Sequence, residues 1–98
     1  METLISRTHT AIVNVITPIA ELKYSIPGIH NVLVVDNDSK HYLVIRLGWA
    51  KDNNLYSVLV HIKNTEGKIT IHVNNTERDI EEELVGQGIP TDIIEYKN

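Results

Sequence analysis

The sequence contains no cysteine and no long hydrophobic run. Without cysteine, the chain can form neither a disulfide framework nor a thiolate metal site. No apolar stretch approaches the roughly 20 residues that span a bilayer, and the N-terminus lacks the charged start and compact apolar block of a secretory signal. We therefore expect a cytoplasmic protein that does not enter a membrane. A chain of 98 residues is long enough for one domain, covering residues 1–98.

The sequence also lacks a basic run. Its net charge is −4, and the segment from Glu77 to Glu95 holds seven acidic residues against one basic residue, Arg78. Such a segment repels phosphates instead of releasing counterions from them. Strong direct binding of nucleic acid by this chain alone is therefore disfavoured.

No catalytic or cofactor-binding motif is present. The sequence has no glycine-rich dinucleotide motif, P-loop, zinc-protease helix, nucleophile elbow or calcium loop. The acidic run Glu81–Glu83 points in successive directions around a helix and so forms no paired acid–base site. We predict no catalytic residues, no cofactor and no metal site, and a protein that is not an enzyme.

Four apolar runs separated by short polar turns predict four strands. The first covers about 29–36, and the other three lie between His41 and Val73. The turns at 37–39, 51–54 and 64–67 are too short for a helical crossover, so neighbouring strands should be antiparallel. The expected sheet is a four-stranded antiparallel meander.

Helices are expected before and after this meander in the sequence. A 3.6-residue apolar period predicts a helix from Glu2 to about Tyr24, bent or interrupted near Pro18. A C-terminal helix should be capped by Thr76 and stop before Gly88, followed by one turn at 91–94. The predicted class is α+β, with both helices and the short final turn packed on one face of the sheet.

Side-chain alternation assigns one face of each later strand to the core. The residues expected to point inward are Leu43, Ile45, Leu47, Trp49, Tyr56, Val58, Val60, Ile62, Ile69, Ile71 and Val73. A single helical layer leaves the opposite face open to a partner, and its mixed apolar and polar character is typical of a protein–protein interface. The predicted partner-binding face consists of Tyr42, Val44, Arg46, Ser57, Leu59, His61, Thr70 and His72.

His61 and His72 are the most plausible pair for chemistry on that face. If Glu66 and Gly67 form a two-residue turn, His61 lies directly across from His72, whereas a longer loop places it opposite Thr70. Metal binding would need a third ligand, and no acidic residue or histidine nearby in the sequence supplies one. The pair is interpreted as two polar residues on the open face.

The second half of the chain resembles the XisI-like proteins, the fdxN element excision controlling factors. The motifs that carry the resemblance are Leu47-Gly48-Trp49, the YSVLVHI stretch at 56–62, Gly67-Lys68-Ile69 with Ile71, Thr76-Glu77, Ile80, Glu83-Leu84-Val85, Gly88-Ile89-Pro90 and Asp92-Ile93. Their ordered combination is more specific than any single one. The resemblance implies a small α+β protein of filamentous cyanobacteria and some other bacteria, linked to an XisH-like partner.

Three functions follow as hypotheses. The first is a non-enzymatic accessory factor that controls site-specific excision of a DNA element by contacting an XisH-like protein, with DNA involved only indirectly. The second is direct DNA binding in a recombination complex. The third is a small hydrolase or metal-binding protein centred on His61 and His72. Family members typically continue beyond the position where this chain stops, so if their tail supports dimerisation, we expect a different homo-oligomeric state here.

Overall fold

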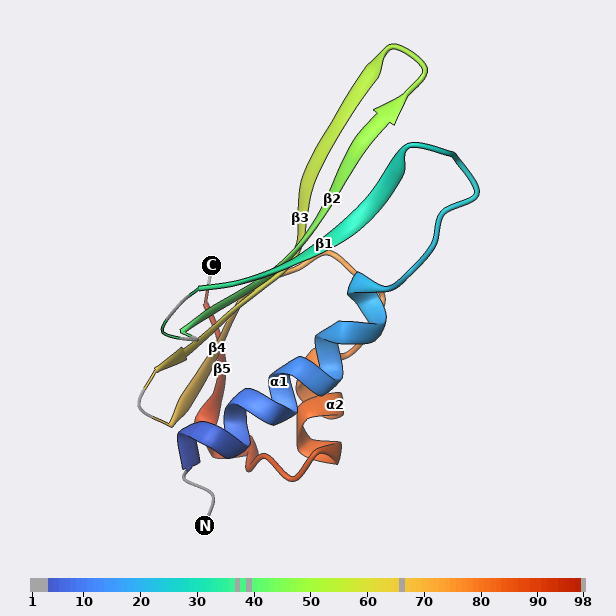
Figure 1. Ribbon diagram of the computed structural model, residues 1–98. Helices are drawn as coiled ribbons and strands as arrows, with labels where there is room; N and C mark the ends of the chain where they lie inside the picture. Colours follow the sequence, from blue (N-terminus) through green and yellow to red (C-terminus); the bar gives the residue numbers. More distant parts are fainter. Residues whose placement is uncertain (1–3, 37, 39, 66, 98) are drawn as a thin grey trace.

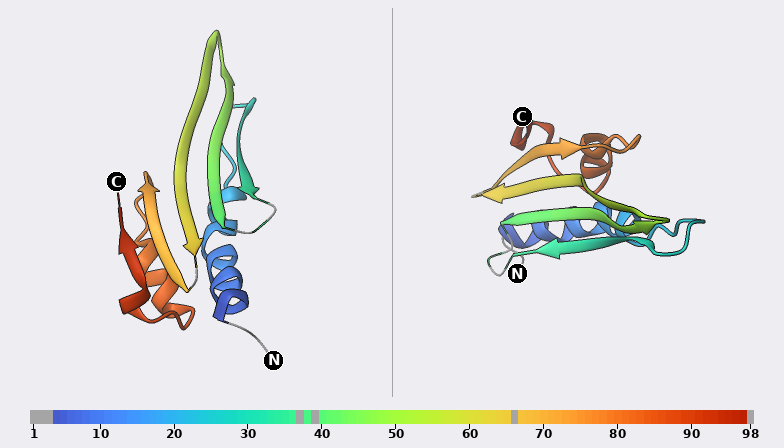
Figure 2. Two further views of the ribbon diagram at one scale, coloured as in Figure 1. Left: turned by 90° about the vertical axis from the view of Figure 1, so that its left-hand side faces the viewer. Right: turned by 90° about the horizontal axis from the view of Figure 1, so that it is seen from above.

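A computed structural model describes residues 4–36, 38, 40–65 and 67–97, with the side chains of 4 and 5 left aside. Helix α1 (Leu4–Ala20) leads into strands β1 (Ile29–Val35), β2 (His41–Ala50), β3 (Asn53–Thr65) and β4 (Lys68–Asn74). Helix α2 (Ile80–Gly86), the 3-10 turn η1 (Thr91–Ile93) and strand β5 (Ile94–Tyr96) complete the chain. Both helices lie on the same face of the sheet (Figures 1 and 2). The predicted α+β class is confirmed.

Within the described residues, the sheet has five strands in the order β1-β2-β3-β4-β5. The first four form the predicted antiparallel meander. The prediction of four strands is incomplete, because β5 pairs in parallel with β4, matching Ile69 with Ile94 and Ile71 with Tyr96. The predicted final turn exists as η1 and leads directly into this short strand.

Helix α1 packs on the sheet through the face predicted for it. Thr8, Ile12, Val15, Ile16 and Ile19 are all buried. The predicted inward side chains of Leu4 and Ile5 lie outside the described residues. The helix is not interrupted at Pro18 and ends two residues later, at Ala20. The Thr17 hydroxyl donates to the Val13 carbonyl at 2.6 Å.

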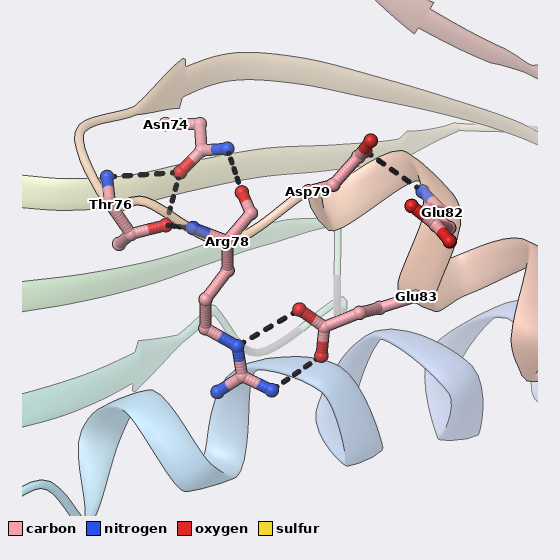
Figure 3. Close-up of polar contacts among 6 residues, drawn as sticks. All are labelled: Asn74, Thr76, Arg78, Asp79, Glu82 and Glu83. Atoms are coloured by element: carbon pink, nitrogen blue, oxygen red, sulfur yellow. Dashed lines mark hydrogen bonds and ion pairs between the residues drawn. The ribbon is translucent and has the colours of Figure 1, made fainter.

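The start of helix α2 differs from the prediction in its cap. Asp79, not Thr76, is the N-cap, and its carboxylate accepts the Glu82 N–H at 3.0 Å. The Asn74 side-chain oxygen accepts from both the backbone N–H and the hydroxyl of Thr76, which holds Thr76 in the preceding turn (Figure 3). This polar turn therefore delays the helix by three residues.

The core lies between the helices and the sheet. Its fully buried side chains come from every layer, and the largest are Tyr42, Ile12, Ile16, Ile62, Ile69, Ile71, Ile80 and Leu84. One polar pair is included: the Asn64 amide donates to the Thr8 hydroxyl at 2.9 Å. The core thus ties α1 to the lower ends of β2, β3 and β4.

The β2–β3 hairpin extends beyond the helical layer (Figure 1). Helix α1 has 17 residues and β3 has 13, which correspond to lengths of about 25 Å and about 43 Å. One helix therefore cannot cover the whole hairpin. The far end of β2 and β3 carries its apolar side chains without a helix above them.

Candidate functional site

The candidate site is the sheet face that the helices leave open (Figure 2, left). Cross-strand pairing aligns Val34 with Leu43, Val32 with Ile45, and Ile45 with Val58 on this face. Leu47 is likewise paired with Tyr56. We call the following set the apolar half of the open face: Val32, Val34, Leu43, Ile45, Leu47, Trp49, Tyr56 and Val58.

Several of these side chains are strongly exposed. Trp49 is 59% exposed, Tyr56 is 69% exposed, and Val32 and Val34 are 37% and 40% exposed. Leu43, Ile45, Leu47 and Val58 are only half-buried and do not belong to the group that packs against the buried core. An apolar surface of this extent commonly marks an interaction site.

The prediction placed the wrong face of β2 in the core. Tyr42 and Val44, expected on the partner-binding face, are fully buried beneath α1, and the Tyr42 hydroxyl lies 2.7 Å from Nδ1 of His9. Trp49, expected inside, is exposed. Both faces of β2 are apolar, so alternation alone could not decide which one the helix would cover.

A β-bulge explains the corresponding error in β3. Val44 pairs with Val60 but Ile45 pairs with Val58, which leaves Leu59 as the extra residue. The bulge shifts the alternation, so Val60 and Ile62 point to the core as predicted, whereas Tyr56 lies on the open face. A strictly alternating strand would have kept all of them on one side.

Three further residues of the predicted partner-binding face also lie on the helix side. Arg46 and Leu59 line a cleft of about 380 Å³ together with Ile19 and Tyr24. Ser57 pairs with Arg46 and shares its face. Of the eight predicted residues, only His61, Thr70 and His72 remain on the open face, and no observation tests their role in binding a partner.

A row of three histidines crosses the open face next to the apolar half. We call His41, His61 and His72 the imidazole row. Nδ1 of His41 lies 3.0 Å from Nε2 of His61, and the His61 and His72 ring centroids are 4.9 Å apart. Burial, followed by the neighbouring His72 and His41, lowers the pKa of His61.

The contact between His61 and His72 arises from a register that differs from the prediction. The turn has two residues, as one alternative required, because Thr65 pairs with Lys68. A second bulge then shifts the pairing, so that His61 lies opposite Val73 while His72 is the extra residue. Their rings nevertheless stack. In the described part of the chain, no three His, Asp or Glu side chains are grouped so as to hold a metal ion.

Beyond the imidazole row, the open face becomes cationic. A depression of about 470 Å³ is lined by Lys63, Thr65, Lys68, Thr70, His72, Glu95 and Lys97, and we call it the lysine depression. The sequence did not predict this depression, because Lys97 lies about thirty residues after Lys63 and Lys68. Only the unexpected parallel strand β5 brings Lys97 beside β4. There the backbone N–H of Lys97 donates to the Ile71 carbonyl at 3.1 Å.

Within residues 4–97, apart from those left undescribed, no helix is long and apolar enough to cross a membrane.

The chain is similar in sequence and fold to known proteins. A crystal structure of an XisI-like protein from Anabaena variabilis ATCC 29413 is 28% identical, with a TM-score of 0.80 and coverage of 94% of this chain and 84% of that one. A crystal structure of the fdxN element excision controlling factor XisI from the same organism shares the fold, with a TM-score of 0.78 at 24% identity, covering 94% and 89%. None of the curated proteins compared with the chain matches it significantly. The family model described as XisI protein matches residues 1–95, and the chain therefore belongs to the XisI family.

Proposed function

We propose that this protein is a non-enzymatic accessory factor that controls site-specific excision of a DNA element, and that it acts by binding an XisH-like protein. Membership of the XisI family supports the regulatory role, as does the fold shared with a protein described as an excision controlling factor. The apolar half of the open face is the observation that carries the binding mechanism.

The physical argument concerns what an uncovered sheet face requires. An antiparallel sheet with helices on one side tolerates water on the other when that side is polar. Here the far end of β2 and β3 instead presents Trp49 and Tyr56, both more than half exposed. Tryptophan and tyrosine are enriched among the residues that dominate binding energy at protein interfaces. A partner with an apolar surface would remove these rings from water.

Charge favours a protein partner over direct contact with DNA. The chain carries a net charge of −4, which gives it no general attraction to a polyanion. An accessory factor that reaches DNA only through its partner needs no attraction to DNA of its own. The partner-binding face is then the apolar half, with the imidazole row at its border.

The test measures binding of the purified protein to the XisH-like protein of the same genome. Trp49→Ala and Tyr56→Ala should each weaken binding about thirtyfold, the effect of losing about 2 kcal/mol at a binding hot spot. Val85→Ala removes a side chain that is 42% exposed on α2, on the other side of the molecule, and is the matched control. All three variants should retain the melting temperature of the parent within a few degrees.

Two results would overturn the mechanism. The first is that the wild-type protein does not bind the XisH-like protein. The other is that Trp49→Ala and Tyr56→Ala only convert a homo-oligomer to a monomer and leave partner binding unchanged, because the occupant of the face would then be a second copy. Retention of the wild-type protein alone on duplex DNA, with a steep salt dependence, would support direct DNA binding instead.

A further inference from the structure

The lysine depression lies on the open face at the β3–β4–β5 end, away from the apolar half. Register sets its layout, since Lys63 pairs with Thr70, Thr70 pairs with Glu95, and Thr65 pairs with Lys68. The three strands therefore bring Lys63, Lys68 and Lys97 around one hollow. Figure 2 (left) shows these strands side by side, with no helix in front of them.

The charge in this hollow is opposite to that of the whole protein. Three lysines and one carboxylate, that of Glu95, line the depression, so it is cationic although the chain carries a net charge of −4. The Glu95 carboxylate already accepts a hydrogen bond from the Thr70 hydroxyl at 3.1 Å. No lysine of the depression forms an ion pair with another residue in the described part of the chain.

A second observation concerns the hydroxyl of Thr65. The hydroxyl oxygen of Thr65 is buried and has no hydrogen-bond partner among the described residues, and Thr65 lines the same hollow. Buried polar atoms in folded proteins almost always have a partner, because an unpaired one costs about 1–3 kcal/mol. Rotation of the Thr65 side chain about χ1 would turn this hydroxyl into the hollow, where a bound oxyanion would accept hydrogen bonds from it and from the lysines.

We propose that the lysine depression binds a small phosphate-bearing anion such as pyrophosphate or the phosphate tail of a nucleotide. Lysine ammonium groups bind phosphate as compact point charges. A tetrahedral phosphate offers several oxygens, which matches lysine donors on β3, on β4 and just after β5. The depression has a volume of about 470 Å³, which suits a small ligand. It is a single hollow and not an extended groove that could follow a DNA duplex.

The imidazole row should make anion binding in the lysine depression depend on pH. His72 lines the depression, stacks on His61, and through it reaches His41. Near the other end of the row, the Asp36 carboxylate accepts a hydrogen bond from the backbone N–H of His41 at 3.3 Å. The charged and titratable groups that face the row are Asp36 beside His41, Lys63 on β3, Lys68 on β4, Glu95 on β5 and Lys97 just after β5. Positive charge on the imidazole row at low pH would add to that of the lysines, so an anion should bind more tightly as the pH falls.

The experiment is isothermal titration calorimetry with inorganic pyrophosphate at low salt, at about pH 6 and about pH 7.5, which bracket the ordinary histidine pKa of about 6.5. The wild-type protein should bind severalfold more tightly at the lower pH. Lys68→Gln combined with Lys97→Gln should weaken binding at least about tenfold at both values. His72→Gln should remove most of the difference between them.

Lys23→Gln, which removes an exposed lysine distant from the depression, is the matched control and should bind like the wild type. The proposal is overturned if pyrophosphate gives no saturable binding, or if Lys23→Gln weakens binding as much as the double variant. It is also overturned if a short duplex DNA binds and pyrophosphate does not, or if only an acidic peptide competes for the site. The assay contains no protein partner, so its outcome is independent of the proposed XisH-like interaction.

Discussion

Replacing Gly48 with alanine should greatly lower the free energy of unfolding, because no side chain fits at that position. Gly48 has a φ of +139°, a backbone conformation that side-chain-bearing residues rarely adopt. A Cβ there would lie 1.8 Å from the carbonyl oxygen of Gly28 and 2.9 Å from Cα of Ile29. Both are backbone atoms, so relief requires that β1 and β2 separate.

The magnitude follows from two contributions. Holding alanine in this region of φ costs about 1–3 kcal/mol. Separating the strands also breaks the hydrogen bond from the Trp49 N–H to the Gly28 carbonyl, which is 3.2 Å long, and such a bond contributes about 1 kcal/mol. We expect a loss of about 3 kcal/mol in the free energy of unfolding. For a domain of this size, that lowers the melting temperature by about 12–24 °C.

Urea denaturation followed by far-ultraviolet circular dichroism measures this loss, and Gly86 provides the matched control. No heavy atom lies within 4 Å of the position that a Cβ on Gly86 would occupy, and the residue is the last of α2. Gly86→Ala should therefore leave the protein as stable as before or stabilise it by up to about 1 kcal/mol. A Gly48→Ala variant within about 1 kcal/mol of the parent would refute the reasoning.

Three further predictions concern stability. Thr8→Val should lower the free energy of unfolding by about 1–3 kcal/mol in urea denaturation, because it leaves the buried Asn64 amide without its acceptor; an unchanged midpoint would contradict this. Asp79→Ala should cost about 1 kcal/mol, because the Glu82 N–H loses its cap, whereas Asp79→Asn should retain most of it. The third concerns pH: His61 has a lowered pKa when folded, so the unfolded chain binds more protons and stability falls as pH drops below about 6.5. His61→Gln should flatten that slope, and an equally steep slope in the variant would assign it to other groups.

The sequence was sufficient for most elements because their patterns are local. The 3.6-residue period that placed Ile12 and Ile16 on the inner face of α1 is visible within one helix, and both residues are buried. The two-residue turn before Lys68 was one of the two alternatives that the residues adjacent in the chain allowed. Strand β5 is different. It has three residues, too few for a periodicity, and its parallel pairing with β4 depends on the path of the segment that precedes it.

The candidate site was harder to predict because it depends on which face the helix covers. Tyr42 and Leu43 are equally suited to a core, and only the docking of α1, with His9 against the Tyr42 hydroxyl, buries one of them. The bulges at Leu59 and His72 have no glycine or other marker in the sequence.

The two bulges give the open face its division into different chemical halves. At the Leu59 bulge the alternation of β3 shifts, so Tyr56 joins Trp49 on the open face at the point where α1 no longer reaches. At the second bulge, His72 is displaced in register yet stacks on His61, which closes the imidazole row between the apolar half and the lysine depression. Because the row separates them, variants of Trp49 and Tyr56 leave every lysine of the depression in place. The apolar half and the cationic half can therefore be altered one at a time, and a defect that appears in both assays would indicate a change in the sheet itself.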